Sequence, residues 1–184
     1  MRAVILAGGK GTRLRPYTIV FPKPLMPIQH EPILKVVISQ LKAAGFSHIT
    51  LAVGHMADMF KTYFGGGEKL GLKIDYTHEP RPLGTIGALS LVEELPENFL
   101  VMNGDILTDL NFKEFLDYHR QHRAKATIAC FRKQVKIEYG IITSDGSNAI
   151  NGYNEKPTLH YEVSMGVYAF QKGIVDFVDK ERYL

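Results

Sequence analysis

The stretch Arg2–Pro16, RAVILAGGKGTRLRP, passes from a short apolar run into a glycine-rich turn that carries Lys and Arg side chains. Because the apolar run is continuous rather than alternating, it is typical of a parallel strand that is buried on both faces. The glycines let the backbone approach a bound group closely and turn its N–H groups toward an anion. The stretch therefore predicts a buried first strand with an anion-binding turn at its carboxyl end.

Strand-like and helix-like segments alternate along the rest of the chain. Strands are expected at residues 2–7, 48–53, 72–79, 98–105, 125–131 and 161–170, and helices at 31–45, 56–65, 84–95, 112–122 and from 173 onward. A hairpin is expected over residues 139–157, with its turn at Asp145-Gly146. The alternation predicts an α/β fold, a Rossmann-like three-layer sandwich with a mixed, mostly parallel central sheet.

The composition is that of an ordinary globular protein, and it narrows the function classes. The chain has 184 residues, 45% hydrophobic and 22% charged, which suits one domain over residues 1–184. A formal net charge of +3 is too small to argue for a nucleic-acid partner. No apolar run approaches the ~20 residues of a membrane span, so a cytoplasmic enzyme or binding domain is expected, with no membrane partner. The single cysteine, Cys130, lies in the apolar run ATIACF and is expected to be buried.

Three polar loops follow three of the expected strands. GGKGTRLRP follows the first, HEPRPLGT the third and NGD the fourth. Ligands of open α/β sheets bind beyond the carboxyl ends of the strands, so these loops are expected to form one site. The first loop matches neither the P-loop nor the G-x-G-x-x-G pattern, because it lacks the Gly-Lys-Ser/Thr of the one and the third glycine of the other.

Together these motifs resemble the signature of the sugar-phosphate nucleotidylyltransferases, also called NDP-sugar pyrophosphorylases. LAGGKGTRLRPYTIVFPKPLMPI follows the pattern G-G-x-G-T-R-L-x-P-x-T and then P-K-P-L-x-P-I nearly throughout. The blocks PLGTIGAL, VMNGDIL, EYGIIT, NEKP and SMGVYAF come next, in the order that the family has them. The PLGT-x-GAL block is similar to that of the mannose- and heptose-1-phosphate guanylyltransferases. The resemblance covers almost the whole chain.

The resemblance implies a reaction in which a sugar 1-phosphate attacks the α-phosphorus of an NTP, giving an NDP-sugar and pyrophosphate. It implies that Arg13 stabilises the α-phosphate and the departing pyrophosphate, and that Lys23 contacts the phosphates. It also implies that Asp105 of NGD holds Mg²⁺, a hard cation that prefers carboxylate and phosphate oxygens. These three side chains are the expected catalytic residues.

Two further sets of residues are implied by the same resemblance. The nucleotide is expected to contact Leu6, Ala7, Gly8, Gly9, Gly11, Thr12, Glu79, Pro82, Gly84 and Thr85. The sugar phosphate is expected to contact Tyr139, Gly140, Glu155, Lys156 and Gly166. Within that second set, Glu155 would accept hydrogen bonds from sugar hydroxyl groups and Lys156 would pair with the phosphate.

The residue at position 79 favours GTP as the nucleotide. An ionised Glu79 accepts hydrogen bonds and donates none, and guanine offers two adjacent donor groups to such a carboxylate. Uracil and thymine present one N–H between two carbonyl groups, so a carboxylate would accept one hydrogen bond and be repelled by the carbonyl oxygens. CTP and UTP stay open as alternatives, since the amino group of cytosine is another donor.

A second class of function, binding without catalysis, is an alternative to the enzyme. The chain could be a non-catalytic nucleotide- or sugar-nucleotide-binding domain, or a regulatory fragment, because members of the family run longer and this sequence looks truncated at its C-terminus. The presence of Arg13, Lys23, Asp105 and Lys156 favours the enzyme. Whether the chain forms a homo-oligomer is left open.

Overall fold

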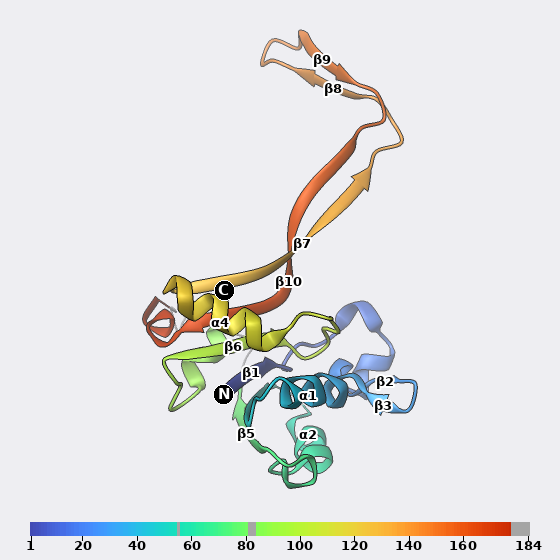
Figure 1. The fold of residues 1–184 in the computed structure, drawn as a ribbon. Helices are drawn as coiled ribbons and strands as arrows, with labels where there is room; N and C mark the ends of the chain where they lie inside the picture. The colour runs from blue at the N-terminus through green and yellow to red at the C-terminus, as the bar shows by residue number, and fades with distance from the viewer. Residues whose placement is uncertain (55, 81–83, 178–184) are drawn as a thin grey trace. The chain divides into compact units, whose positions relative to one another are not determined.

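The computed structural model describes residues 1–54, 56–80 and 84–177 (Figure 1). Two compact units make up the structure. The first comprises Met1–Ile128 and Gly166–Leu184, and the second comprises Ala129–Met165. The sequence predicted one domain over residues 1–184, and that assignment stays a prediction.

A six-stranded sheet forms the centre of the fold, in the order β5-β4-β1-β6-β10-β7. Its strands are β1 (Arg2–Leu6), β4 (His48–Val53), β5 (Lys73–His78), β6 (Asn98–Asn103), β7 (Ala126–Lys136) and β10 (Thr158–Gln171). The pairs β1–β4, β1–β6 and β4–β5 are parallel, whereas β10 runs antiparallel to β6. The predicted α/β fold with a mixed, mostly parallel sheet is therefore confirmed.

Helices accompany this sheet in the first unit (Figure 1). They are α1 (Ile33–Ala43), α2 (Ala57–Phe64), α3 (Gly84–Gly87) and α4 (Phe112–His122). One face of α1 is buried through Leu34, Val37, Ile38 and Leu41, at the three- and four-residue spacing of an amphipathic helix. Asn111 caps α4, because its side chain accepts hydrogen bonds from the backbone N–H groups of Lys113 and Glu114.

Short elements complete the first unit. Strands β2 (Pro27–Ile28) and β3 (Glu31–Pro32) form a small antiparallel pair before α1. Short 3-10 turns occupy Thr12–Leu14, Tyr17–Ile19, Lys23–Leu25, Glu68–Leu70, Ala88–Leu91 and Lys172–Phe177. The helix that was expected from residue 173 is thus a 3-10 turn as far as the described residues go.

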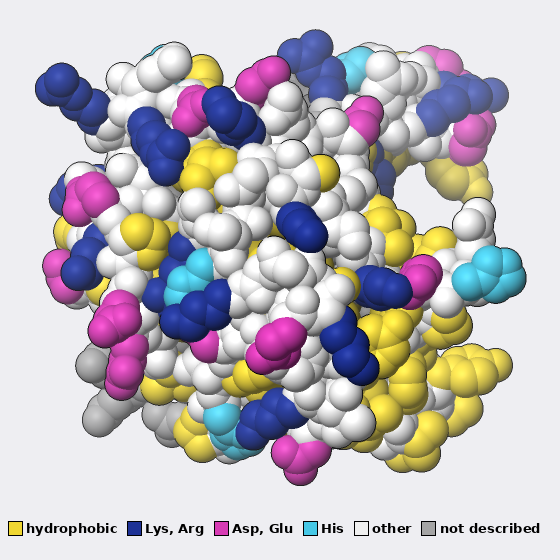
Figure 2. All heavy atoms as spheres, turned by 60° about the horizontal axis from the view of Figure 1, so that its bottom comes forward, with side chains coloured by type: hydrophobic (Ala, Val, Ile, Leu, Met, Phe, Trp, Pro, Cys, Tyr) yellow, Lys and Arg dark blue, Asp and Glu magenta, His cyan; other side chains and the backbone are white. Residues whose placement is uncertain are grey.

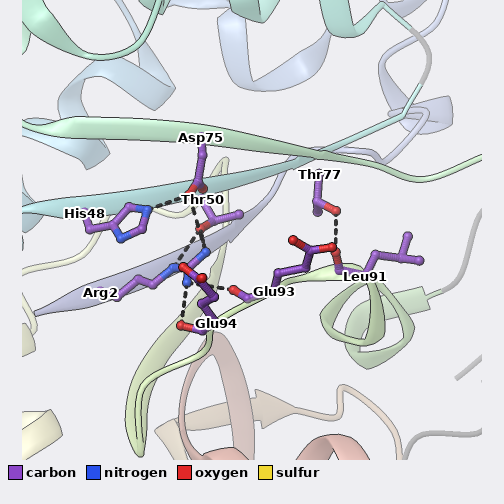
Figure 3. Close-up of polar contacts among 8 residues, drawn as sticks. All are labelled: Arg2, His48, Thr50, Asp75, Thr77, Leu91, Glu93 and Glu94. Carbon is purple, nitrogen blue, oxygen red and sulfur yellow. Dashed lines mark hydrogen bonds and ion pairs between the residues drawn. The ribbon is translucent and has the colours of Figure 1, made fainter.

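The helix that the sequence predicted over residues 84–95 is much shorter in the structure. Helix α3 ends at Gly87, a 3-10 turn continues to Leu91, and Glu94 has a positive φ of 53°. Beyond this turn, the carbonyl oxygens of Glu93 and Glu94 accept hydrogen bonds from Nη1 of Arg2 at 2.9 Å each (Figure 3). These carbonyl groups are therefore held by the sheet rather than by a helix.

The second unit contains the predicted hairpin. Strands β8 (Ile141–Ser144) and β9 (Ile150–Asn154) pair antiparallel, and the turn between them begins at Asp145. The Asp145 carboxylate stabilises the turn by accepting hydrogen bonds from the backbone N–H groups of Ser147 and Ala149, at 2.9 and 3.2 Å.

Cys130 corrects one expectation. The sequence predicted a buried thiol, but Cys130 is exposed. Side chains alternate along β7, so that Ala129 is buried and its neighbour Cys130 faces the opposite side of the strand. The apolar run was correctly read as a strand, but only one of its faces is covered there.

Candidate functional site

A cleft of about 350 Å³ lies at the carboxyl end of β1. The loop after β1, the 3-10 turn Lys23–Leu25 and the residues that follow β5 and β6 all contribute to its walls. Its lining residues are Leu6, Ala7, Gly8, Gly9, Gly11, Thr12, Arg13, Leu14, Lys23, Pro24, Glu79, Gly84, Asn103 and Asp105. The structure thus brings the three polar loops to one place, as the rule for open α/β sheets predicts.

A side chain on either of two glycines of the first loop would collide with a neighbouring side chain. A Cβ atom on Gly8 would lie 2.5 Å from Oε1 of Glu79, and one on Gly11 would lie 2.8 Å from Cγ2 of Thr18. Gly11 also has a φ of +57°, in the left-handed region that L side chains rarely adopt. The Thr18 hydroxyl donates to the carbonyl oxygen of Gly11 at 2.8 Å and holds the turn in this form.

Glu79 is fixed beside that loop by the strand that precedes it. Its backbone N–H donates to the carbonyl oxygen of Val53 at 2.9 Å, continuing the pairing of β5 with β4. Its carboxylate lies against the backbone of Gly8 in the wall of the cleft. The cleft therefore presents an acceptor side chain next to the glycine-rich backbone.

Lys23 and Asp105 form an ion pair inside the cleft. Lys23 begins a 3-10 turn between Pro22 and Pro24, and the backbone N–H of Leu25 donates to Pro22 at 2.9 Å. Asp105 comes directly after Gly104, whose N–H donates to the carbonyl oxygen of Leu6 at 2.9 Å. Two backbone turns therefore set the positions of these side chains, which are 37% and 21% exposed.

The chemistry of Asp105 fits a hard cation. Its carboxylate already lies against one positive group, the Lys23 ammonium, and both line the same cleft. In residues 1–54, 56–80 and 84–177, no group of three or more His, Cys, Asp or Glu side chains is arranged to hold a metal ion. A magnesium ion here would thus be held by Asp105 together with substrate phosphates and water, as Mg²⁺ sites often are.

Arg13 contributes a second cation to the cleft. It lies in the 3-10 turn Thr12–Leu14, and its side chain is exposed along the cleft wall. With Lys23 it gives the cleft two positive side chains beside a glycine-rich backbone, which is a suitable surface for a polyphosphate.

Three residues of the cleft were missed in the sequence: Leu14, Pro24 and Asn103. Asn103 opens the NGD motif, from which only Asp105 had been selected, so its motif position could have identified it. A Cβ atom on Gly166 would lie only 2.6 Å from Nδ2 of Asn103. Gly166 also has a φ of +74°. Gly166, expected at the sugar phosphate, is thus packed against an Asn of the cleft.

Most of the other predicted residues belong to the second unit. Tyr139, Gly140, Glu155 and Lys156 belong to the second unit, where Tyr139 is 80% exposed. Pro82 lies outside the described residues, and the backbone of Thr85 is part of α3.

A second cleft, of about 400 Å³, lies around Arg2. Its charged groups already bind one another (Figure 3). Nε and Nη2 of Arg2 donate to Oγ1 of Thr50 at 3.0 and 2.8 Å, Nη2 pairs with Asp75 at 3.4 Å, and Nε2 of His48 lies 2.6 Å from the same carboxylate. This network joins three neighbouring strands, so we assign it a structural role.

The surface offers no single basic face in the view of Figure 2. Lys and Arg side chains are interspersed there with Asp and Glu side chains, in keeping with the small net charge of +3. Among the helices that the structure describes, none combines the length and the apolar character needed to cross a membrane.

Comparison with known proteins agrees with the geometry of the cleft. A model of the family described as nucleotidyl transferase matches residues 2–183. Enzymes of this family generally use a divalent metal ion. The mannose-1-phosphate guanylyltransferase catalytic subunit beta of Xenopus tropicalis is 38% identical over 184 residues, which cover 96% of this chain and 51% of that protein.

The names of two further relatives mention different nucleotides. A UTP--glucose-1-phosphate uridylyltransferase of Synechocystis is 32% identical over 97% of this chain and 51% of its own length. The crystal structure of HddC from Yersinia pseudotuberculosis complexed with GMP-PN is similar with a TM-score of 0.69 and 26% identity, over 98% of this chain and 79% of that one. The chain spans about half the length of the curated relatives it matches.

Proposed function

Because the chain belongs to the nucleotidyl transferase family, we propose that it transfers a nucleotidyl group from an NTP, with GTP favoured, to a sugar 1-phosphate. A phosphate oxygen of the sugar 1-phosphate attacks the α-phosphorus, the bond to the β-phosphate breaks, and pyrophosphate leaves with the electron pair. The observation that carries the proposal is the cleft, in which a glycine-rich turn, Arg13, Lys23 and Asp105 come together.

The roles within the cleft follow from charge and reach. The backbone of residues 6–12 binds the nucleotide and its phosphates, since its glycines carry no side chain that would keep a phosphate away. Arg13 stabilises the α-phosphate and the negative charge that grows on the departing pyrophosphate. Lys23 leaves Asp105 and contacts the phosphates. Asp105 holds Mg²⁺, which neutralises charge on the phosphate oxygens when it is bound.

Glu79 is the residue that we propose reads the base. Its carboxylate lies beside Gly8, at the edge of the loop that receives the nucleotide, and it meets the N1–H and N2–H₂ donors of guanine. The name of the guanylyltransferase relative and the GMP-PN complex of HddC support GTP. The uridylyltransferase relative keeps UTP as an alternative, and CTP is a third.

For the sugar 1-phosphate we propose Tyr139, Gly140, Glu155, Lys156 and Gly166 as the contacting residues. Glu155 accepts hydrogen bonds from sugar hydroxyl groups, and Lys156 pairs with the phosphate. The names of the relatives point to mannose 1-phosphate and glucose 1-phosphate as the first sugars to test. The cytoplasmic location and any homo-oligomer remain predictions from the sequence.

The test is a matrix of GTP, UTP, CTP and ATP against mannose 1-phosphate and glucose 1-phosphate, with pyrophosphate release as the readout. We expect release to depend on Mg²⁺ and to be fastest with GTP. Asp105→Asn should abolish it, whereas Asp109→Asn, an exposed carboxylate outside the cleft lining, should not. Clear preference for UTP would contradict the assignment of the base.

The same matrix, combined with calorimetry of GTP binding, separates catalysis from simple binding. If GTP binds with micromolar affinity in calorimetry but no sugar 1-phosphate gives pyrophosphate, the chain is a nucleotide-binding domain and the transferase proposal fails.

A further inference from the structure

Tyr153 contacts one of the proposed sugar-phosphate residues, although no motif singled it out. It lies on β9, and its hydroxyl group donates a hydrogen bond to Oε2 of Glu155. This bond raises the pKa of the Tyr153 phenol from its ordinary value of 10.0. A hydrogen bond from a neutral hydroxyl to a carboxylate is charge-assisted and stronger than one between neutral groups.

The ring of Tyr153 also covers Gly140. A Cβ atom on Gly140 would lie 2.4 Å from the Tyr153 hydroxyl oxygen and 2.7 Å from ring atoms Cε2 and Cζ. The pairing of β8 with β9 brings about this contact, because it places Ile142 opposite Tyr153 and Ile141 opposite Asn154. Gly140 directly precedes β8 and Glu155 directly follows β9, so Tyr153 contacts one residue next to each strand.

We propose that Tyr153 is a positioning residue of the sugar 1-phosphate site, which fixes the Glu155 carboxylate for a sugar hydroxyl group. This inference rests on the proposed function of the chain. A carboxylate has two acceptor oxygens, and with Oε2 bound to Tyr153 the other, Oε1, is left to accept from the sugar. Glu155 is exposed, so without the tyrosine it would sample many rotamers and lose that freedom only on binding.

The first variant is Tyr153→Phe, which keeps the ring over Gly140 and removes the hydroxyl group. With mannose 1-phosphate, or whichever sugar 1-phosphate is turned over fastest, we expect its KM to rise about fivefold to tenfold. The KM for GTP should not change. Glu155→Ala should raise the same KM, and adding Tyr153→Phe to it should have little further effect, because Glu155→Ala already removes the acceptor of the Tyr153 hydroxyl group.

Gly140→Ala provides a second route to the same contact. Its methyl group displaces the Tyr153 ring and should raise the KM for the sugar 1-phosphate in the same direction. Tyr161→Phe is the matched control, since Tyr161 is an exposed tyrosine on β10 in the same unit, and its kinetics should equal those of the wild type. Circular dichroism and an unchanged KM for GTP would show that each variant is folded.

Two outcomes overturn the proposal, and they are distinguishable. If the wild-type protein is active and Tyr153→Phe has an unchanged KM for the sugar 1-phosphate, the positioning role is wrong while the proposed function stands. If the wild-type protein releases no pyrophosphate with any pair in the matrix, the proposed function fails and the positioning role fails with it.

Discussion

The ammonium group of Lys23 and the carboxylate of Asp105 form an ion pair across 82 positions of sequence, inside the cleft that the glycine-rich turn borders. Lys23 belongs to a 3-10 turn that contacts α1, and Asp105 follows directly after β6 and Gly104. In this pair, the Lys23 ammonium group lies against the carboxylate that we propose as a ligand of Mg²⁺. We therefore expect magnesium binding at Asp105 to compete with Lys23, and phosphate binding to draw Lys23 away.

Lys23→Gln separates these two effects. Without nucleotide, we expect the variant to bind Mg²⁺ about threefold more tightly than the wild type, because a partly exposed ion pair contributes little. With GTP and a sugar 1-phosphate, we expect turnover to fall about 100-fold, because the phosphates lose a cation in the transition state. Titration calorimetry gives the first quantity and pyrophosphate release the second.

Lys69→Gln is the control for that experiment, since Lys69 is exposed and lies outside the cleft lining. Weaker Mg²⁺ binding in Lys23→Gln than in the wild type would show that the two cations do not compete at Asp105.

Glu79→Gln should change which nucleotide the protein prefers. The amide places a donor next to one of the guanine donors, and an unmatched polar group of this kind costs about 1–3 kcal/mol. We expect kcat/KM for GTP to fall about tenfold or more while that for UTP is unchanged or higher. The ratio of the two, measured in one assay, is the readout. Glu93→Gln, whose side chain is exposed outside the cleft, should keep the wild-type ratio, and an unaltered ratio in Glu79→Gln would remove Glu79 from base recognition.

Much of this fold could be predicted because its elements are encoded locally. The apolar runs of β1, β4 and β6 each depend on a few neighbouring residues. The same holds for the cleft, since parallel strands bring the loops after them to one edge of the sheet. Topology therefore predicted that the loops converge, and the resemblance to the family pointed to Arg13, Lys23, Glu79 and Asp105 within them.

What escaped prediction depends on contacts between distant residues. Arg2 binds the carbonyl groups of residues 91 and 92 positions away in the sequence, a contact that no local pattern reveals. Tyr153 gave no signal for a similar reason, because its role comes from the register of β8 and β9. Cys130 was misjudged because an apolar run does not tell which face of a strand is covered.

Gly11→Ala tests whether the form of the glycine-rich turn is needed. The substitution forces a side chain into the left-handed region and toward the Thr18 methyl group, at 2.8 Å. We expect the free energy of unfolding to fall by about 1–2 kcal/mol, with loss of nucleotide binding in the folded protein. Urea denaturation and GTP titration measure the two effects. Gly146→Ala is the matched control, since a Cβ atom there would meet nothing within 4 Å, and equal stability of the two variants would refute the argument.

His119 should make the stability of the protein sensitive to pH below neutrality. It is fully buried on α4, its Nδ1 lies 2.8 Å from Oγ1 of Thr127, and burial, with a smaller effect of Arg120, lowers its pKa from the ordinary 6.5. Below that value the unfolded chain binds a proton that the folded protein resists, so the free energy of unfolding must fall as the pH falls. We expect urea denaturation between about pH 7.5 and about pH 5.5 to show this fall, and His119→Gln to reduce its slope. His122→Gln, at an exposed position of the same helix, should keep the wild-type slope, and an unchanged slope in His119→Gln would mean that another group causes the dependence.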